Sequence, residues 1–178
     1  MTRLLRALTL VTATASLAGC GYTLAGRGNT LPTHIRTIGV PQCVNHSATP
    51  DIDGVLTDKV RQELTSRGRY LINPGVEGAD ATLTCTVVAV TIIPIEFGAD
   101  RLPIRQAIVV TASIEFKDVK DDKVLYSNPG FQARDEFSVT TSQSVNDPNA
   151  FLRTNVQAME RLAQNFARTI VTSILEAF

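Results

Sequence analysis

The sequence predicts an α+β domain: a four-stranded, mostly antiparallel sheet covered on one face by two helices, in the order β-α-β-β-β-α. Two long stretches carry apolar residues at helical spacing, and three consecutive stretches alternate apolar and polar residues as strands do. Consecutive alternating strands favour an antiparallel meander. One apolar stripe on each helix favours packing of both helices on the same sheet face.

The first two elements are a strand and a helix. Apolar residues alternate over residues 35–40, which predicts the strand. A helix over about residues 50–67 follows, because Thr49-Pro50-Asp51 offers a capping hydroxyl, a first-turn proline and an acid facing the helix dipole. Gly68 is suited to end it. The apolar stripe of this helix comprises Ile52, Val55, Leu56, Val60 and Leu64.

Three further strands are expected over residues 81–90, over residues 107–117 and from Val124 onward, with residues 94–106 as a loop. Asn128-Pro129-Gly130 interrupts the last of them, which makes it an edge strand or one that carries a bulge. The predicted inward face of the first of these strands comprises Leu83, Cys85, Val87 and Ala89. The predicted outer face comprises Thr82, Thr84, Thr86, Thr111, Ser113 and Glu115.

The last element is a long helix over roughly residues 148–176, which Asp147-Pro148 begins in the manner of the first helix. Its stripe comprises Leu152, Val156, Met159, Leu162, Phe166, Ile170 and Ile174. A chain of this length buries most of its unfolded surface, so the domain is expected to fold without a metal.

The first nineteen residues read as a lipoprotein signal peptide. Two arginines precede a short apolar run, and Leu17-Ala18-Gly19-Cys20 resembles the bacterial lipobox, in which the cysteine is acylated before cleavage. A plain secretory signal and an uncleaved anchor are the alternatives, and the run is too short for the roughly 20 apolar residues of a span. We therefore expect lipid on Cys20, a lipidated tether over residues 20–30 and a single domain over residues 31–178. Gly21, in place of Asp, favours the outer membrane.

The charge balance restricts the possible partners. Basic and acidic residues both number 17, so the formal net charge is zero. Nucleic-acid binding requires a basic excess, and no nucleic-acid partner is expected.

No catalytic residue, cofactor or metal is predicted, and the chain is not expected to be an enzyme. His34 lies in no recognisable motif, and Cys43-x-x-His46 is half of a zinc spacing whose other half is missing. Asp118, Asp121 and Asp122 cluster, as solvated acids of a turn between strands commonly do, and a calcium site is the alternative interpretation.

Two cysteines remain once Cys20 is lipidated. Cys43 and Cys85 could form a disulfide in an oxidising compartment, and closing a loop of about 40 residues stabilises by roughly 4 kcal/mol. One observation argues against the bridge. Cys85 lies on the inward face of its strand, whereas a continued first strand would place Cys43 on the face opposite to Ile38 and Val40. Cys43 would therefore need to lie beyond the end of that strand. Two free buried thiols and a bridge both remain open, and a bridge is our working hypothesis.

Several segments together resemble the LptE family of lipopolysaccharide-assembly lipoproteins. They are Cys20-Gly21-Tyr22-Thr23-Leu24, Leu31-Pro32, Ile35-Arg36-Thr37-Ile38-Gly39-Val40-Pro41, Gly78-Ala79-Asp80-Ala81 and Leu125-Tyr126-Ser127-Asn128-Pro129. The resemblance covers residues 20–178 and implies a four-stranded sheet with two helices on one face.

The resemblance also implies a function. LptE-like proteins plug the lumen of the outer-membrane barrel LptD from the periplasmic side, help it to assemble and bind lipopolysaccharide. The family places a basic residue between the second and third strands, where this chain has Arg101 and Arg105. The family also has a basic residue after the fourth strand. Residues 140–149 have none, which departs from the family pattern, and Arg134 and Arg153 lie nearby.

The alternative is a periplasm-facing, lipid-tethered binding module of another envelope system, which holds peptidoglycan or a hydrophobic ligand. Such a module would present a concave pocket lined by aromatic residues. The chain has only ten aromatic residues, none of them Trp, which disfavours a site for stacking sugars.

Overall fold

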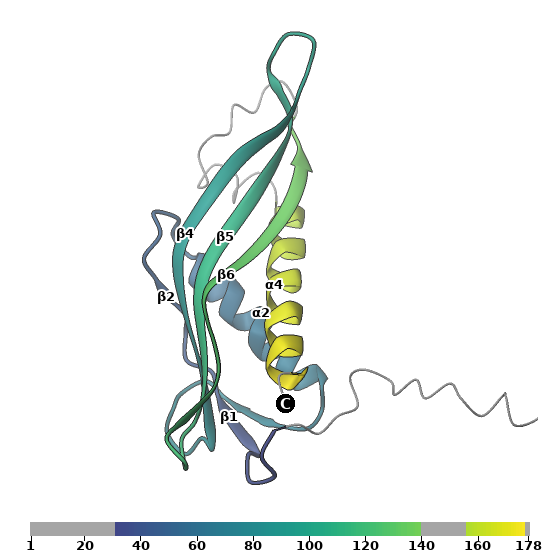
Figure 1. The fold of residues 1–178 in the computed structure, drawn as a ribbon. Helices are drawn as coiled ribbons and strands as arrows, with labels where there is room; N and C mark the ends of the chain where they lie inside the picture. Colours follow the sequence, from purple (N-terminus) through teal and green to yellow (C-terminus); the bar gives the residue numbers. More distant parts are fainter. Residues whose placement is uncertain (1–30, 140–155, 177–178) are drawn as a thin grey trace, which may run out of the picture.

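A computed structural model describes residues 31–139 and 156–176. Two layers make up the fold, a long twisted sheet and a pair of helices that both lie on one of its faces (Figure 1). The strands are β1 (Thr37–Gly39), β2 (Val44–Asn45), β3 (Leu71–Asn73), β4 (Ala81–Phe97), β5 (Pro103–Asp118) and β6 (Lys123–Ser138), and the helices are α2 (Ile52–Ser66) and α4 (Val156–Glu176). The predicted α+β class with two helices on a sheet is confirmed. The predicted signal peptide and tether, residues 1–30, lie outside the described residues.

The sheet is mixed and has six strands, so the prediction of four mostly antiparallel strands is wrong in number and in direction. Its order is β3-β1-β4-β5-β6, and β2 pairs separately with β4. β1 runs parallel to β3 and β4, and β2 runs parallel to β4, whereas β4, β5 and β6 form an antiparallel meander. β2 and β3 have two and three residues, too few for a period-two pattern to be visible in the sequence.

β4 alternates as predicted only as far as Val87. A register shift follows between Val87 and Ala89, where Val88 is the extra residue and is half exposed. Beyond it Ala89 pairs with Thr111, while Val90 faces the buried Val110. The prediction that Ala89 points inward is therefore wrong, because the bulge reverses which side chains face the core.

β6 is both an edge strand and irregular, the two possibilities that Pro129 indicated. Its register shifts against β5 between the pairs Ala112–Phe131 and Ile114–Asn128, which brackets Pro129 and Gly130. A proline has no N–H to donate to the ladder, and at an edge its missing donor is tolerated.

Helix α2 buries the predicted stripe except Val55, which is 37% exposed. The predicted Thr49 cap is wrong. Asp51 occupies the N-cap position at φ 61° and makes no side-chain capping hydrogen bond. Thr49 is buried instead, and its carbonyl accepts a hydrogen bond of 2.7 Å from the Asn45 side chain. Gly68 follows the helix at φ 66°, which agrees with its predicted role.

Helix α4 contributes the largest apolar face of the core. Its buried residues are Ala158, Met159, Leu162, Ala163, Phe166, Ala167, Ile170, Val171 and Ile174. Phe166 meets Phe131 of β6 edge to face, with ring centroids 5.3 Å apart. Val156, predicted to be part of the stripe, is 67% exposed at the first described turn. The earlier part of the predicted helix, residues 148–155 with Leu152, lies outside the described residues.

Polar contacts fix the helices and β1 to their neighbours. Lys59 of α2 forms an ion pair with Glu160 of α4. The Asp80 carboxylate accepts hydrogen bonds from the backbone N–H groups of Arg36 (2.9 Å) and Thr37 (2.8 Å), at the start of β1. These two bonds hold the pKa of Asp80 below its ordinary value of 3.8.

Within the described residues, no helix combines the length and the apolar composition that a membrane span requires.

Candidate functional site

The tip of the β4–β5 hairpin projects past the first described turn of α4 (Figure 1). Only residues 98–102 are loop, so the prediction of a loop over residues 94–106 is wrong, and β4 and β5 stay paired as far as Phe97 and Pro103. Two backbone hydrogen bonds close the loop, from the Gly98 N–H to the Leu102 carbonyl (2.8 Å) and from the Arg101 N–H to the Gly98 carbonyl (3.0 Å).

Arg101 is held at the tip in a left-handed backbone conformation. Its backbone φ angle is 62°. This conformation is less stable by roughly 1 kcal/mol or more for a residue that has a Cβ. Its side chain is exposed and has no ion pair to any residue in the described ranges. The tip therefore displays a cation that the rest of the described fold does not neutralise.

Exposed apolar side chains lie in the same loop and at the two strand ends next to it. Phe97 is 58% exposed, Leu102 52% and Ile104 40%. Large apolar side chains grouped at a projecting tip are typical of a surface that contacts another molecule. The tip thus combines the Arg101 cation with apolar surface, and it also carries Asp100, whose carboxylate accepts a hydrogen bond of 3.1 Å from the Leu102 N–H.

The other two predicted arginines lie further from the tip, Arg105 in β5 and Arg134 in β6, and both form ion pairs with carboxylates. Arg105 lies between two carboxylates, with its guanidinium 3.4 Å from Glu96 and 2.6 Å from Glu136. Arg134 of β6 reaches the other oxygen of Glu136 at 3.1 Å. The structure therefore brings Arg105 and Arg134 together through a shared partner and leaves Arg101 apart from them. Sequence reasoning missed Glu96 and Glu136, because their roles depend on cross-strand register.

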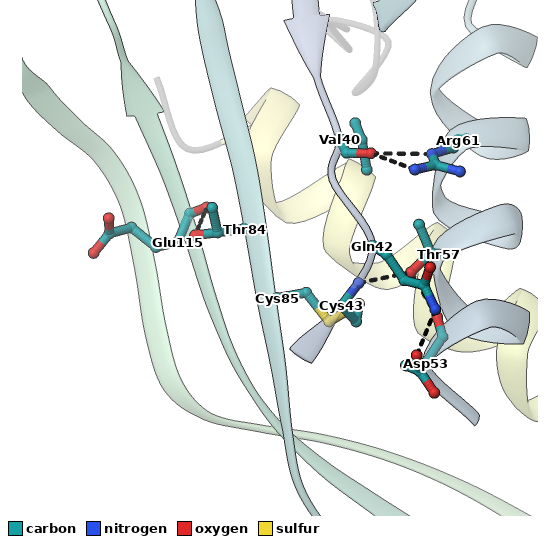
Figure 2. Close-up of a disulfide and its surroundings, with 9 residues drawn as sticks. All are labelled: Val40, Gln42, Cys43, Asp53, Thr57, Arg61, Thr84, Cys85 and Glu115. Atoms are coloured by element: carbon teal, nitrogen blue, oxygen red, sulfur yellow. Dashed lines mark hydrogen bonds between the residues drawn. A yellow bond between two sulfur atoms is a disulfide. The ribbon is translucent and has the colours of Figure 1, made fainter. Parts of the chain in front are cut away.

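The outer face of the sheet is polar where β4 and β5 run side by side. The predicted outer residues, from Thr82 to Glu115, are half-buried or exposed, while Leu83, Cys85 and Val87 between them are buried. Figure 2 shows Cys85 on the helix side of β4 and Thr84 with Glu115 on the opposite side. The two faces therefore separate apolar from polar side chains as predicted up to the bulge.

Cys43 and Cys85 form a disulfide that joins the segment after β1 to β4 (Figure 2), with a sequence separation of 42. The parity argument against a bridge fails because Cys43 lies beyond the end of β1, where its side chain is free to turn towards the core. The Cys43 N–H also donates to the Thr57 hydroxyl of α2 at 2.9 Å. Two bonds from the Arg61 guanidinium to the Val40 carbonyl, at 3.0 and 2.8 Å, hold the same segment.

The Asp118 prediction needs correction. Asp118 is not a solvated turn acid: it is 1% exposed, and its carboxylate lies 2.8 Å from Nε2 of His34. Asp121 and Asp122 are exposed, as expected. The sequence carried no sign of the His34 contact, because the two residues are distant in the chain.

The fold and the tip define a class: an α+β domain with a polar outer sheet face and a projecting hairpin whose tip exposes apolar side chains. The family model described as LptE, lipopolysaccharide-assembly, matches residues 35–174, and the chain belongs to this family.

Solved structures agree on the fold. The chain is similar to lipoprotein B of Nitrosomonas europaea, with 11% identity, a TM-score of 0.56 and coverage of 86% of this chain and 90% of that one. It is also similar to a hypothetical protein of Chlamydia trachomatis, with 10% identity, a TM-score of 0.52 and coverage of 81% and 99%. No curated protein matches the chain in sequence.

Proposed function

We propose that the chain is anchored through lipid on Cys20 to the outer membrane, faces the periplasm, and plugs and helps to assemble an LptD-type barrel that inserts lipopolysaccharide. In this role it acts by binding, and it catalyses no reaction. Membership of the LptE family supports the assignment.

The observation that carries the plug role is the paired charge on the outer sheet face. Two cations, Arg105 and Arg134, meet two anions, Glu96 and Glu136, on neighbouring strands. The interior of a large outer-membrane barrel is polar. Arginines that are paired with carboxylates can enter such a lumen without leaving unpaired cations against it.

The hairpin tip supports direct contact with lipopolysaccharide. Lipid A joins phosphate groups to acyl chains, and the tip joins the Arg101 guanidinium to exposed Phe97 and Leu102. Arginine is well suited to phosphate because its planar fork donates two hydrogen bonds at once. Arg101 is the primary candidate, and Arg105 and Arg134 are secondary because each already binds Glu136.

Co-purification tests the partner. The mature lipoprotein, tagged at its C-terminus, is extracted from membranes in mild detergent, and the proteins that accompany it are identified by mass spectrometry. We expect a large outer-membrane barrel in near-equal amount and acylation of Cys20 in the intact mass. Recovery of the chain alone, or of an unacylated chain, would refute the plug role.

Binding of purified lipopolysaccharide tests the tip. Arg101→Gly removes the cation and also relieves the left-handed backbone, so its fold is not at risk. Loss of one exposed charge-assisted contact to phosphate should weaken binding about fivefold. The control is Arg168→Ala, at an exposed position of α4, which should bind as the unaltered protein does. Equal weakening by both changes would contradict a specific role for Arg101.

The alternative, a binding module of another envelope system, gains no specific support. The larger depression, about 420 Å³, is lined by Leu31, Pro32, Thr33, Ile35, Arg69 and Tyr70. It has one aromatic side chain, whose pKa is raised by burial. The cavity beside the disulfide is about 10 Å³, room for one water at most. Purification of the chain without a barrel partner would favour this alternative over the plug role.

A further inference from the structure

Three side chains with metal-binding atoms converge near the end of the sheet where the chain enters β1. One ligand atom from each of His34, Asp118 and Asp121 lies within 4.8 Å of the other two. His34 belongs to the segment before β1, and the two aspartates belong to the end of β5 and the turn that follows. We call this set the His34–Asp118–Asp121 cluster.

The fold positions the histidine through a turn. The Ile35 N–H donates to the Pro32 carbonyl at 3.0 Å, so His34 lies at the third position of a four-residue turn. Leu31 and Ile35 on either side of this turn are buried in the core. Because both flanks are packed, the imidazole is presented to the sheet end in a defined direction.

The fold also orients the buried carboxylate. Oδ1 of Asp118 accepts hydrogen bonds from the backbone N–H groups of Lys120 (3.0 Å) and Asp121 (3.2 Å). Its Oδ2 is the atom 2.8 Å from Nε2 of His34. Hydrogen bonds to one oxygen of a carboxylate are the arrangement that fixes a metal ligand and leaves the other oxygen available.

A simple His34–Asp118 hydrogen bond does not account for this contact. Nε2 of His34 is buried and close to Oδ2, yet the two groups are not aligned for a hydrogen bond, so Nε2 has no partner. A buried nitrogen without a hydrogen-bond partner is destabilising, because it has lost its hydration without compensation. A cation between Nε2 and the two carboxylates would satisfy the nitrogen and offset the repulsion between Asp118 and Asp121.

The neighbouring charges leave the cluster available to a cation. Asp122, which follows Asp121 in sequence, forms an ion pair with Lys117, whose Nζ lies 2.5 Å from the Asp122 carboxylate. Asp80 is committed to the two backbone N–H groups at the start of β1. Asp121, in contrast, uses its backbone N–H for Asp118 and is exposed, with its carboxylate open to solvent.

We propose that the His34–Asp118–Asp121 cluster is a divalent metal site that takes Zn²⁺. One imidazole nitrogen and two carboxylate oxygens form a ligand set that zinc accepts, with water in the fourth position. Ca²⁺ requires six or more oxygens, which the cluster does not supply. The bound ion ties the segment that leads from the N-terminus into β1 to the β5–β6 turn, so that force on the tether is transmitted to the sheet.

Calorimetric titration of the metal-free, mature full chain with Zn²⁺ in detergent tests the proposal, with an affinity tag that lacks histidine. We expect one equivalent to bind. His34→Gln and Asp121→Asn should each weaken binding at least about tenfold. The matched controls are His46→Gln, which changes the only other histidine, and Asp122→Asn, which changes the adjacent acid; both should bind as the unaltered chain does.

Three outcomes would overturn the site: no saturable binding by the unaltered chain, unchanged binding by His34→Gln and Asp121→Asn, or loss of binding in a control variant. Asp121 is exposed, so Asp121→Asn is expected to fold normally, and circular dichroism verifies this. The result is independent of the barrel and of lipopolysaccharide, so its failure leaves the proposed function standing.

Discussion

Reduction of the disulfide should remove a large share of the stability of the domain. Cys43 and Cys85 are 42 residues apart in sequence, and the chain-entropy relation for a loop of that size gives roughly 4 kcal/mol. Domains of this kind are stable by about 5–15 kcal/mol, so the cross-link is a substantial fraction of the total. For a protein of this size, a loss of about 4 kcal/mol lowers the melting temperature by about 8–16 °C.

The assay compares urea unfolding of the oxidised and the reduced protein, with thiols counted under denaturing conditions before and after reduction. We expect no titratable thiol from Cys43 or Cys85 before reduction and two after it. The Cys43→Ala/Cys85→Ala variant is the control, because its unfolding should not respond to the reductant. It should also be less stable than the reduced protein, since it loses two buried sulfur atoms.

Two results would refute this reasoning. Free thiols in the unreduced protein would mean that the bridge does not form. A fully reduced protein within about 1 kcal/mol of the oxidised one would mean that its unfolded state is already restricted without the cross-link.

Three further predictions concern other parts of the fold. Phe166→Ala should lower the free energy of unfolding by about 3–5 kcal/mol, whereas Val156→Ala at an exposed position should change it by less than about 0.5 kcal/mol; urea unfolding checks both. Asp80 has a lower pKa folded than unfolded, so its contribution is present above pH 3.8 and is lost as the pH falls through the folded pKa. Asp80→Asn should therefore be less stable than the unaltered protein at neutral pH, and the gap should narrow below pH 3.8; a constant gap would contradict the linkage. Glu136→Gln should bind lipopolysaccharide about threefold more tightly, because Arg105 then keeps only its longer ion pair, with Glu96, and attracts phosphate more strongly. Weaker binding by this variant would argue against lipopolysaccharide binding at this end of the sheet.

The helices and the long strands were predictable because each presents one apolar face at a regular period. The stripe Ile52, Leu56, Val60 and Leu64 is buried as expected. The prediction failed where regularity ends. One extra residue, Val88, reverses the parity of β4, and no local propensity distinguishes it from its neighbours. β2 and β3 exist because parallel pairing with β4 and β1 completes the sheet, which is a tertiary effect.

The candidate site was predictable only in part, for a similar reason. Arg101 could be located between two strands by sequence alone, because the loop lies between two recognisable alternating stretches. The ion pairs of Arg105 could not be predicted from the sequence, because they depend on which acidic residues the strand register brings close to it. The His34 contact with Asp118 was also out of reach, since nothing in either local sequence points to the other residue.

The length of the hairpin links the two proposals about the ends of the sheet. β4 has 17 residues, and at about 3.3 Å per residue it spans roughly 55 Å. Ile92 is the last residue of β4 that packs in or against the core, and Glu96 and Phe97 at the end of the strand are exposed. Exposing Phe97 there gives the isolated domain no stability, whereas a partner that covers it would gain about 1.5–3 kcal/mol. The His34–Asp118–Asp121 cluster lies at the opposite end, where the chain enters the fold. A protein held from one end that contacts its target at the other needs a rigid body between them, and the disulfide at Cys85, the fifth residue of β4, supplies a cross-link there.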